Sequence, residues 1–159
     1  QLLTQVSGRS GRSEKPGEVI IQTNHSEYKL FEKVAEHDYE GFYDTELRSR
    51  EAGMYPPFGR IGLVEIKSKN QKEAERISRN AFDTLKNFKY GSYLQIFTPS
   101  QPLISKAKDF YRYHVVVKSS RKTDPSGKIL IESFRHLRQN TDSGSGVRIT
   151  YDIDAMNFL

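Results

Sequence analysis

The feature that most constrains the fold is the order of strand-like and helix-like segments after residue 59. Apolar and polar residues alternate in four of these segments, as in half-buried strands, and recur at helical spacing in two others. The order is strand 60–68, helix 70–88, strand 93–98, strand 110–120, helix 124–139 and strand 147–154. Short connections and right-handed crossovers turn such a β-α-β-β-α-β order into a ferredoxin-like sheet with both helices on one face. We therefore predict an α+β fold whose other sheet face is open.

Apolar spacing also predicts which residues face the helices. In strand 110–120 the alternation directs Tyr111, Tyr113, Val115 and Val117 inward, and Arg112, His114 and Lys118 toward the open face. The other inward residues are Ala74, Ile77, Ala81, Leu85 and Phe88 of the first helix and Val147, Ile149, Tyr151 and Ile153 of the last strand. The second helix is expected to begin with Asp124 as its N-cap and Pro125 as its first residue.

The first 53 residues form a separate pattern. It consists of a helix end at 1–6, a Gly/Ser-rich loop, a strand at Glu18–Thr23, a helix with Ser26 near its N-cap, and a helix from Asp38 to a C-cap at Gly53. Two prolines in M-Y-P-P-F at 54–58 then prevent the helix from continuing. We place the domain boundary there, between 1–53 and 54–159. Because the chain begins within an apolar pattern and without Met, we expect it to be a fragment.

Charge is divided unevenly between these two parts. The net charge is −3 over 1–53 and +8 over 54–159, and a basic part suits a polyanionic partner, although surface lysines of ordinary domains give similar totals. The absence of cysteine excludes disulfides and thiolate zinc sites, and no apolar run reaches the roughly 20 residues that span a bilayer. The four histidines lack metal-ligand spacing and a neighbouring nucleophile. We therefore predict no metal site and no complete set of catalytic residues.

The segment 99–122 is the most basic part of the chain, with a net charge of +5 and interleaved aromatic residues. Cations neutralise phosphates and aromatic rings stack on bases, so this segment is a candidate for nucleic-acid or partner contact. The tyrosines are expected to face the core, so the candidates for contact are the basic residues of this segment. The alternative is that these residues lie on a solvated loop and bind nothing. They are Lys106, Lys108, Arg112, His114, Lys118 and Arg121.

Two short motifs remain. Residues 5–12 read Q-V-S-G-R-S-G-R, in which Gln5 and two arginines held by glycines can point at one spot, as phosphoryl transfer requires. The alternative is a basic Gly/Ser loop, but the helix before the motif and the strand after it favour the first interpretation. Asp152 and Asp154 lie on one side of the last strand, where they could bind a metal or the basic loop, or simply form a solvated edge.

The octet resembles motif VI of superfamily 2 helicases. The stretches L-L-T-Q-V-S-G-R-S-G-R, F-Y-R-Y-H-V-V-V-K and Y-D-I-D resemble the C-terminal end of the primosomal N-prime family, the bacterial replication-restart helicases. The most distinctive match is F-Y-x-x-E-L-x-x-R-x-x-x-x-Y-P-P-F at Phe42–Phe58. The chain departs from the family at its closing motif, where Ala155 replaces a usual proline.

The resemblance implies that 1–53 is the tail of a RecA-like helicase lobe, with Gln5 and Gly8 at the ATP γ-phosphate and Arg9 and Arg12 as arginine fingers. It implies ATP-dependent 3′→5′ DNA unwinding in the cytoplasm at abandoned forks, followed by primosome assembly. Mg²⁺, most of the ATP site and the zinc module would lie upstream, so this chain alone is expected to be inactive. The implied partners are branched and single-stranded DNA, single-strand-binding protein, primosome proteins and the replicative helicase.

Two other functions fit the residues. The chain could be a freestanding nucleic-acid-binding module in which the N-terminal loop is a basic arm. The C-terminal domain could instead serve mainly as a protein-docking surface.

Overall fold

A computed structural model describes residues 2–7, 19–142, 144 and 146–155 of the chain. The chain divides into two compact units, Gln1–Ser49 and Arg50–Leu159.

The regular secondary structure described in the first unit is helical. It contains α1 (Leu2–Ser7), α2 (Lys29–Ala35) and most of α3 (Tyr39–Ala52). Asp38 begins α3 as expected, because its Oδ1 accepts a hydrogen bond from the Gly41 backbone at 2.8 Å and its Oδ2 accepts one from Lys33 at 2.5 Å. The hydrogen bonds that Lys33 and Gly41 donate lower the pKa of the Asp38 carboxyl.

Two expectations for the first unit are wrong. Residues 19–23 form no strand, and Ile20 is 84% exposed. A strand needs a neighbouring strand to receive its backbone hydrogen bonds, and the described residues of this unit contain none. The helix expected near Ser26 begins only at Lys29, because the Tyr28 N–H bonds to the His25 carbonyl and closes a turn first.

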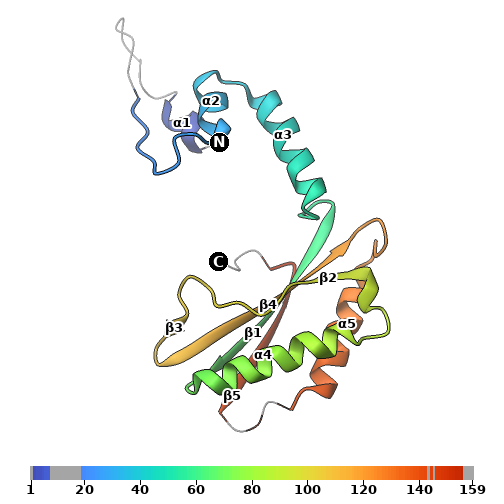
Figure 1. Ribbon diagram of the computed structural model, residues 1–159. Coiled ribbons are helices and arrows are strands. Elements are labelled where there is room, and N and C mark those ends of the chain that lie inside the picture. The colour runs from blue at the N-terminus through green and yellow to red at the C-terminus, as the bar shows by residue number, and fades with distance from the viewer. Residues whose placement is uncertain (1, 8–18, 143, 145, 156–159) are drawn as a thin grey trace, which may run out of the picture. The chain divides into compact units, whose positions relative to one another are not determined.

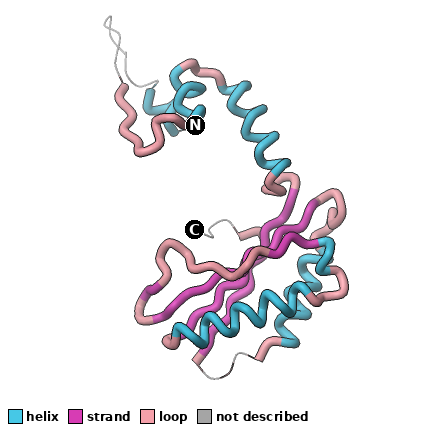
Figure 2. Tube along the Cα trace, viewed as in Figure 1, coloured by secondary structure: helices cyan, strands magenta, loops and turns pink. Residues whose placement is uncertain are grey.

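The second unit is an antiparallel sheet with two helices on one face (Figures 1 and 2). The strands lie in the order β2-β4-β1-β5, and a short strand β3 extends the edge of β4. Each crossover helix connects strands that have another strand between them: β4 separates β1 from β2, and β1 separates β4 from β5. This is the split β-α-β arrangement of the predicted ferredoxin-like fold. The elements are β1 (Gly59–Ser68), α4 (Gln71–Lys86), the short 3-10 helix η1 (Gly91–Tyr93), β2 (Leu94–Ile96), β3 (Lys106–Ala107), β4 (Phe110–Ser120), α5 (Lys128–Asn140) and β5 (Val147–Ile153).

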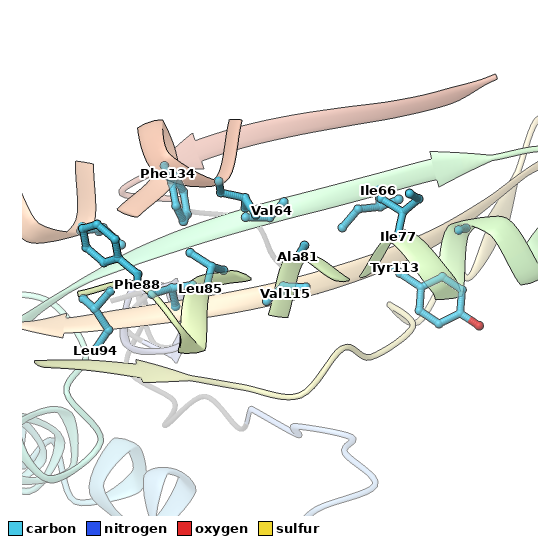
Figure 3. Packing of buried hydrophobic residues seen from close by; sticks show 14 residues of the cluster. Val64, Ile66, Ile77, Ala81, Leu85, Phe88, Leu94, Tyr113, Val115 and Phe134 are labelled. Atoms are coloured by element: carbon cyan, nitrogen blue, oxygen red, sulfur yellow. The ribbon is translucent and has the colours of Figure 1, made fainter. Parts of the chain in front are cut away.

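The core lies between the sheet and the two helices (Figure 3). Asn70 starts α4 by accepting hydrogen bonds from the Lys72 and Glu73 backbone, and the predicted inward face of α4 is buried. Gly62 allows α5 to approach β1, because a Cβ at that position would lie 2.5 Å from Cζ of Phe134. The buried cluster includes the predicted Ala74, Ile77, Ala81, Leu85, Phe88, Tyr113, Val115 and Val117.

Helix α5 begins later than predicted. The helix begins at Lys128, after Gly127 at φ 75°, and not at Pro125. Gly127, and not Asp124, therefore occupies the N-cap position, but the buried Asp124 carboxylate still accepts hydrogen bonds from the first turn, from the backbone of Ile129 at 3.1 Å and Leu130 at 3.2 Å. A turn closed by the Gly127 N–H, which donates to the Asp124 carbonyl, occupies residues that were expected to be helical.

The edge of β4 is covered along much of its length. Strand β2 is shorter than predicted, but residues 97–105 continue beside β4 through hydrogen bonds from Phe97 to Val116, between Ser100 and His114, and from Arg112 to Ser105. The chain then returns through β3 in a hairpin that the sequence did not reveal. No helix among the described residues has the length and apolar character needed to cross a bilayer.

The β3–β4 hairpin has a strained two-residue turn. Ala107 pairs with Phe110, so Lys108 and Asp109 form the turn, at φ 49° and 67°. Two positive φ values are what a type I′ turn requires; every residue with a Cβ has a steric cost there that glycine avoids, although asparagine and aspartate have the smallest.

We expect Asp109→Gly to stabilise the chain by about 1 kcal/mol, because glycine adopts positive φ without steric cost. Asp109→Ala removes the same charge without relieving the turn and is the matched control. Thermal unfolding of the two variants measures the difference. A Gly variant no more stable than the Ala variant would show that the turn is not strained.

Candidate functional site

The sheet face opposite α4 and α5, called the second face below, carries a row of three cations. In the pairing register Lys67 of β1 lies between Arg112 of β4 and Arg148 of β5. The next row contains Glu65 between His114 and Thr150. Like charges directly opposite each other in a sheet are destabilising, so this row needs a nearby counter-charge.

Glu65 supplies that counter-charge. Its Oε1 accepts hydrogen bonds from Arg112 at 2.5 and 2.8 Å and lies 3.4 Å from Nε2 of His114, while its Oε2 lies 2.5 Å from Nζ of Lys67. Burial alone would raise the pKa of the Glu65 carboxyl, but hydrogen bonds from Lys67, Arg112 and His114 outweigh that effect and lower the pKa from 4.5 to about 2. Glu65 is therefore ionised at neutral pH and forms ion pairs with two of the three cations.

Arg148 is the third cation of the row. Neither Arg148 nor Lys108 forms an ion pair with any residue in the described ranges. The hairpin turn brings Lys108 to the same place, where a hollow of about 430 Å³ opens on the second face. We call it the basic hollow; its lining residues are Lys67, Ala107, Lys108, Phe110, Arg112 and Arg148.

A second, smaller hollow adjoins the basic one. It has a volume of about 220 Å³ and shares Lys67 and Arg112 with it, but it also contains Glu65 and Asp152. We call it the acidic hollow. The second face is therefore positive near the hairpin and carries carboxylates beside that positive region.

The expected open face is not open at two of the predicted residues. His114 is 3% exposed and Lys118 is 6% exposed. The Lys118 ammonium donates a hydrogen bond to the Gly53 carbonyl at 2.8 Å and lies over the rings of Tyr55 at 3.4 Å and Phe97 at 5.4 Å. The segment after α3 and residues 97–100 cover this end of the face. The prediction that His114 and Lys118 lie on an open face is therefore wrong.

The other basic candidates are separated by the length of β4. Lys106 and Lys108 lie in the hairpin at one end, where Lys106 is 5.1 Å from the Tyr111 ring. Arg121 is exposed after the other end, where its backbone bonds to Phe58. The structure thus brings together Lys108 and Arg112, but places Lys118 and Arg121 elsewhere.

Sequence reasoning missed Lys67, Phe110 and Arg148 as site residues. The alternation in each strand showed that Lys67 and Arg148 point away from the helices. Only the register between β1, β4 and β5 places them beside Arg112. Phe110 shares its side of β4 with Arg112, which the alternation could have indicated.

The motif at residues 5–12 falls largely outside the described residues. Gln5 is exposed on α1, whereas Gly8, Arg9 and Arg12 are not described. At the other end, Asp154 accepts a hydrogen bond from Arg60 at 2.6 Å. No group of three or more potential metal ligands occurs among the residues that the structure describes.

We expect Glu65 to make stability depend on pH in the acid range. Its folded-state pKa lies below the ordinary value, so its contribution is present above pH 4.5 and is lost as the pH falls toward about 2. That contribution is roughly 3 kcal/mol. Denaturant unfolding of Glu65→Gln should show lower stability at pH 7 and a weaker pH dependence between these limits.

Glu75→Gln is the control, because the ion pair of Glu75 with Arg79 lies at the surface of α4. We expect it to change stability by no more than about 0.5 kcal/mol. Equal effects of the two substitutions would contradict the role assigned to the Glu65 cluster.

Comparison with known proteins identifies the family. Residues 51–156 match the primosomal protein N C-terminal domain. Replication restart protein PriA of Bacillus subtilis is 39% identical over 87% of this chain, and that of Synechocystis is 37% identical over 99%. The chain spans 18% of the length of each of these relatives. A de novo designed protein with a ferredoxin fold aligns with 62% of the chain at 12% identity and a TM-score of 0.40, too weak a likeness to support an argument. The chain belongs to the primosomal protein N family, and residues 51–156 form its C-terminal domain.

Proposed function

We propose that this chain is the C-terminal part of a replication-restart DNA helicase, and that its second unit binds DNA through the basic hollow. The observation that carries the DNA-binding proposal is the row of three cations with a single carboxylate between two of them. Relatives named replication restart proteins support the wider role. A restart protein must hold DNA while the replication machinery assembles on it.

In this proposal Lys108 and Arg148 are the main phosphate contacts. Both line the basic hollow and neither forms an ion pair within the described part of the chain. Arginine binds phosphate oxygens bidentately, and lysine adds a compact point charge. Arg112 and Lys67 contribute less, because both bind Glu65.

The ATP-dependent part of the proposal concerns the N-terminal residues. We assign Gln5 and Gly8 to the γ-phosphate of ATP, and Arg9 and Arg12 to charge stabilisation during phosphoryl transfer. The remaining ATP and Mg²⁺ ligands belong to other parts of the intact protein. Zinc, which the family resemblance implies, has no suitable ligand cluster among the described residues and is likewise assigned elsewhere.

The proposed partners are branched and single-stranded DNA, single-strand-binding protein and the primosome proteins, in the cytoplasm. Protein docking is a second candidate function for the C-terminal domain. It is favoured by two adjacent apolar residues on the loop beside β4, Leu103 at 88% and Ile104 at 63% exposure. Isolated exposed apolar residues are common on protein surfaces, so this observation is the weaker of the two.

We expect Arg148→Gln and Lys108→Gln each to weaken DNA binding by this 159-residue chain and to reduce its salt dependence. Each lost phosphate contact should lower the slope of log K against log salt by about 0.7 for single strands. Fluorescence anisotropy with an end-labelled oligonucleotide over a series of salt concentrations measures both quantities.

Lys72→Gln is the matched control, because it removes one exposed positive charge on α4, away from the second face. If it reduces the slope as much as Arg148→Gln does, binding follows net charge and the site is wrong. Salt-insensitive binding to single-strand-binding protein, with no affinity for the oligonucleotide, would favour the docking function.

We also expect Arg9→Ala and Arg12→Ala, made in the intact protein, to lower DNA-stimulated ATP hydrolysis by roughly 10³-fold with DNA affinity unchanged. Lys15→Ala, three residues after the motif in the sequence, is the control and should leave hydrolysis intact. Phosphate release assays measure the hydrolysis rate of each variant. Normal hydrolysis by both arginine variants would refute the assignment.

A further inference from the structure

The basic hollow contains an aromatic ring that phosphate binding alone does not require. Phe110 is half-buried at the first position of β4 and lies on the same side of that strand as Arg112. The residues that pack between the sheet and the helices come from the opposite side of β4, and they include Tyr111 and Tyr113 but not Phe110. The ring is therefore not part of the described core.

The surroundings of Phe110 suit a flat ligand that carries negative charge. Lys67, Lys108, Arg112 and Arg148 line the hollow around the ring, and the Lys69 ammonium lies 5.8 Å from the ring centroid. The volume of about 430 Å³ is within the range of roughly 300–1,000 Å³ found for small-ligand sites. Base stacking on an aromatic ring beside phosphate-binding cations is a common arrangement for single-stranded nucleic acid.

The charge pattern limits the ligand to one strand. The acidic hollow adjoins the basic hollow; Lys67 and Arg112 bind its Glu65, but Asp152 forms no ion pair within the described residues, and its carboxylate would repel the phosphates of a second strand. A base inside a duplex also has both faces covered by its neighbours and cannot stack on Phe110. Both observations disfavour a duplex in the hollow.

We propose that the basic hollow binds a single unpaired nucleotide of DNA, with its base stacked on Phe110 and its phosphate bound by Lys108 and Arg148. This inference rests on the proposed DNA-binding function and specifies the ligand of the same site. It predicts that the chain distinguishes DNA with an exposed unpaired base from continuous duplex. A fork or a gap offers such a base, and intact double-stranded DNA does not.

The test uses the 159-residue chain and three ligands: an octathymidylate, the same strand with one central abasic position, and a blunt duplex. Phe110→Leu keeps apolar bulk but removes the ring. We expect it to weaken octathymidylate binding about tenfold, within the range for losing one stacked base, and to leave duplex binding unchanged. Tyr93→Leu removes an exposed ring on η1 outside the hollow and should change neither.

A strand with 2-aminopurine at one position provides a test that can also be read on the unchanged chain. Stacking on Phe110 should change its fluorescence on binding, and Phe110→Leu should abolish that change. Thermal unfolding shows whether Phe110→Leu is folded. If it is not, two measurements on the unchanged chain test the inference: the 2-aminopurine signal and the loss of affinity for the abasic strand.

The outcomes separate the two proposals. If Arg148→Gln weakens binding but Phe110→Leu and the abasic position do not, the hollow binds phosphate without stacking and this inference fails alone. If neither Arg148→Gln nor Phe110→Leu affects binding, the site assignment under the proposed function fails as well. Tighter binding to the duplex than to the single strand would also overturn the inference.

Discussion

The Glu65 carboxylate is the interaction on which the second face depends. β1 is the only described strand paired on both edges with long partners, and its register sets Lys67 between two arginines. Without a counter-charge, three adjacent cations would repel one another across the sheet. Glu65 binds two of them directly, whereas Arg148 forms no ion pair within the described residues. A single carboxylate therefore stabilises the sheet and also determines which cation can act.

Strand β4 uses its two ends differently. At one end Lys118 is buried against Tyr55 and bonds to the Gly53 carbonyl, so its charge fixes the segment that follows α3 to the sheet. Lys122 adds an ion pair with Glu51 in the last turn of α3. At the other end, the hairpin holds Lys108 at a positive φ beside the basic hollow. Charge at the first end is structural, and charge at the hairpin is exposed to a ligand.

The sequence predicted the fold of the second unit better than its site. Periodicity within one segment reveals which side of a helix or strand is apolar, and it placed Val115, Val117 and Tyr113 correctly in the core. The site depends on pairing between segments, and Lys67, Arg112 and Arg148 meet only through the register of three strands. Local hydrogen bonds also overrode propensity, as at Asp124, whose carboxylate accepts hydrogen bonds from the first turn of α5 without occupying the N-cap position. The strand expected at 18–23 lacked a described partner and is absent from 19–23, the part that is described.

The same distinction explains why the density of charge along the chain was a poor guide to the site. The segment 99–122 has a net charge of +5, yet three of its positive residues are held by other parts of the protein: Arg112 by Glu65, Lys118 by Gly53 and Tyr55, and Lys122 by Glu51. Arg148 lies outside that segment, where its neighbours in sequence gave no sign of a basic site. Phosphate binding depends on cations that remain uncompensated after folding, and compensation is decided by long-range contacts. A cation row with too few carboxylates is therefore a stronger indication of an anion site than a basic stretch of sequence.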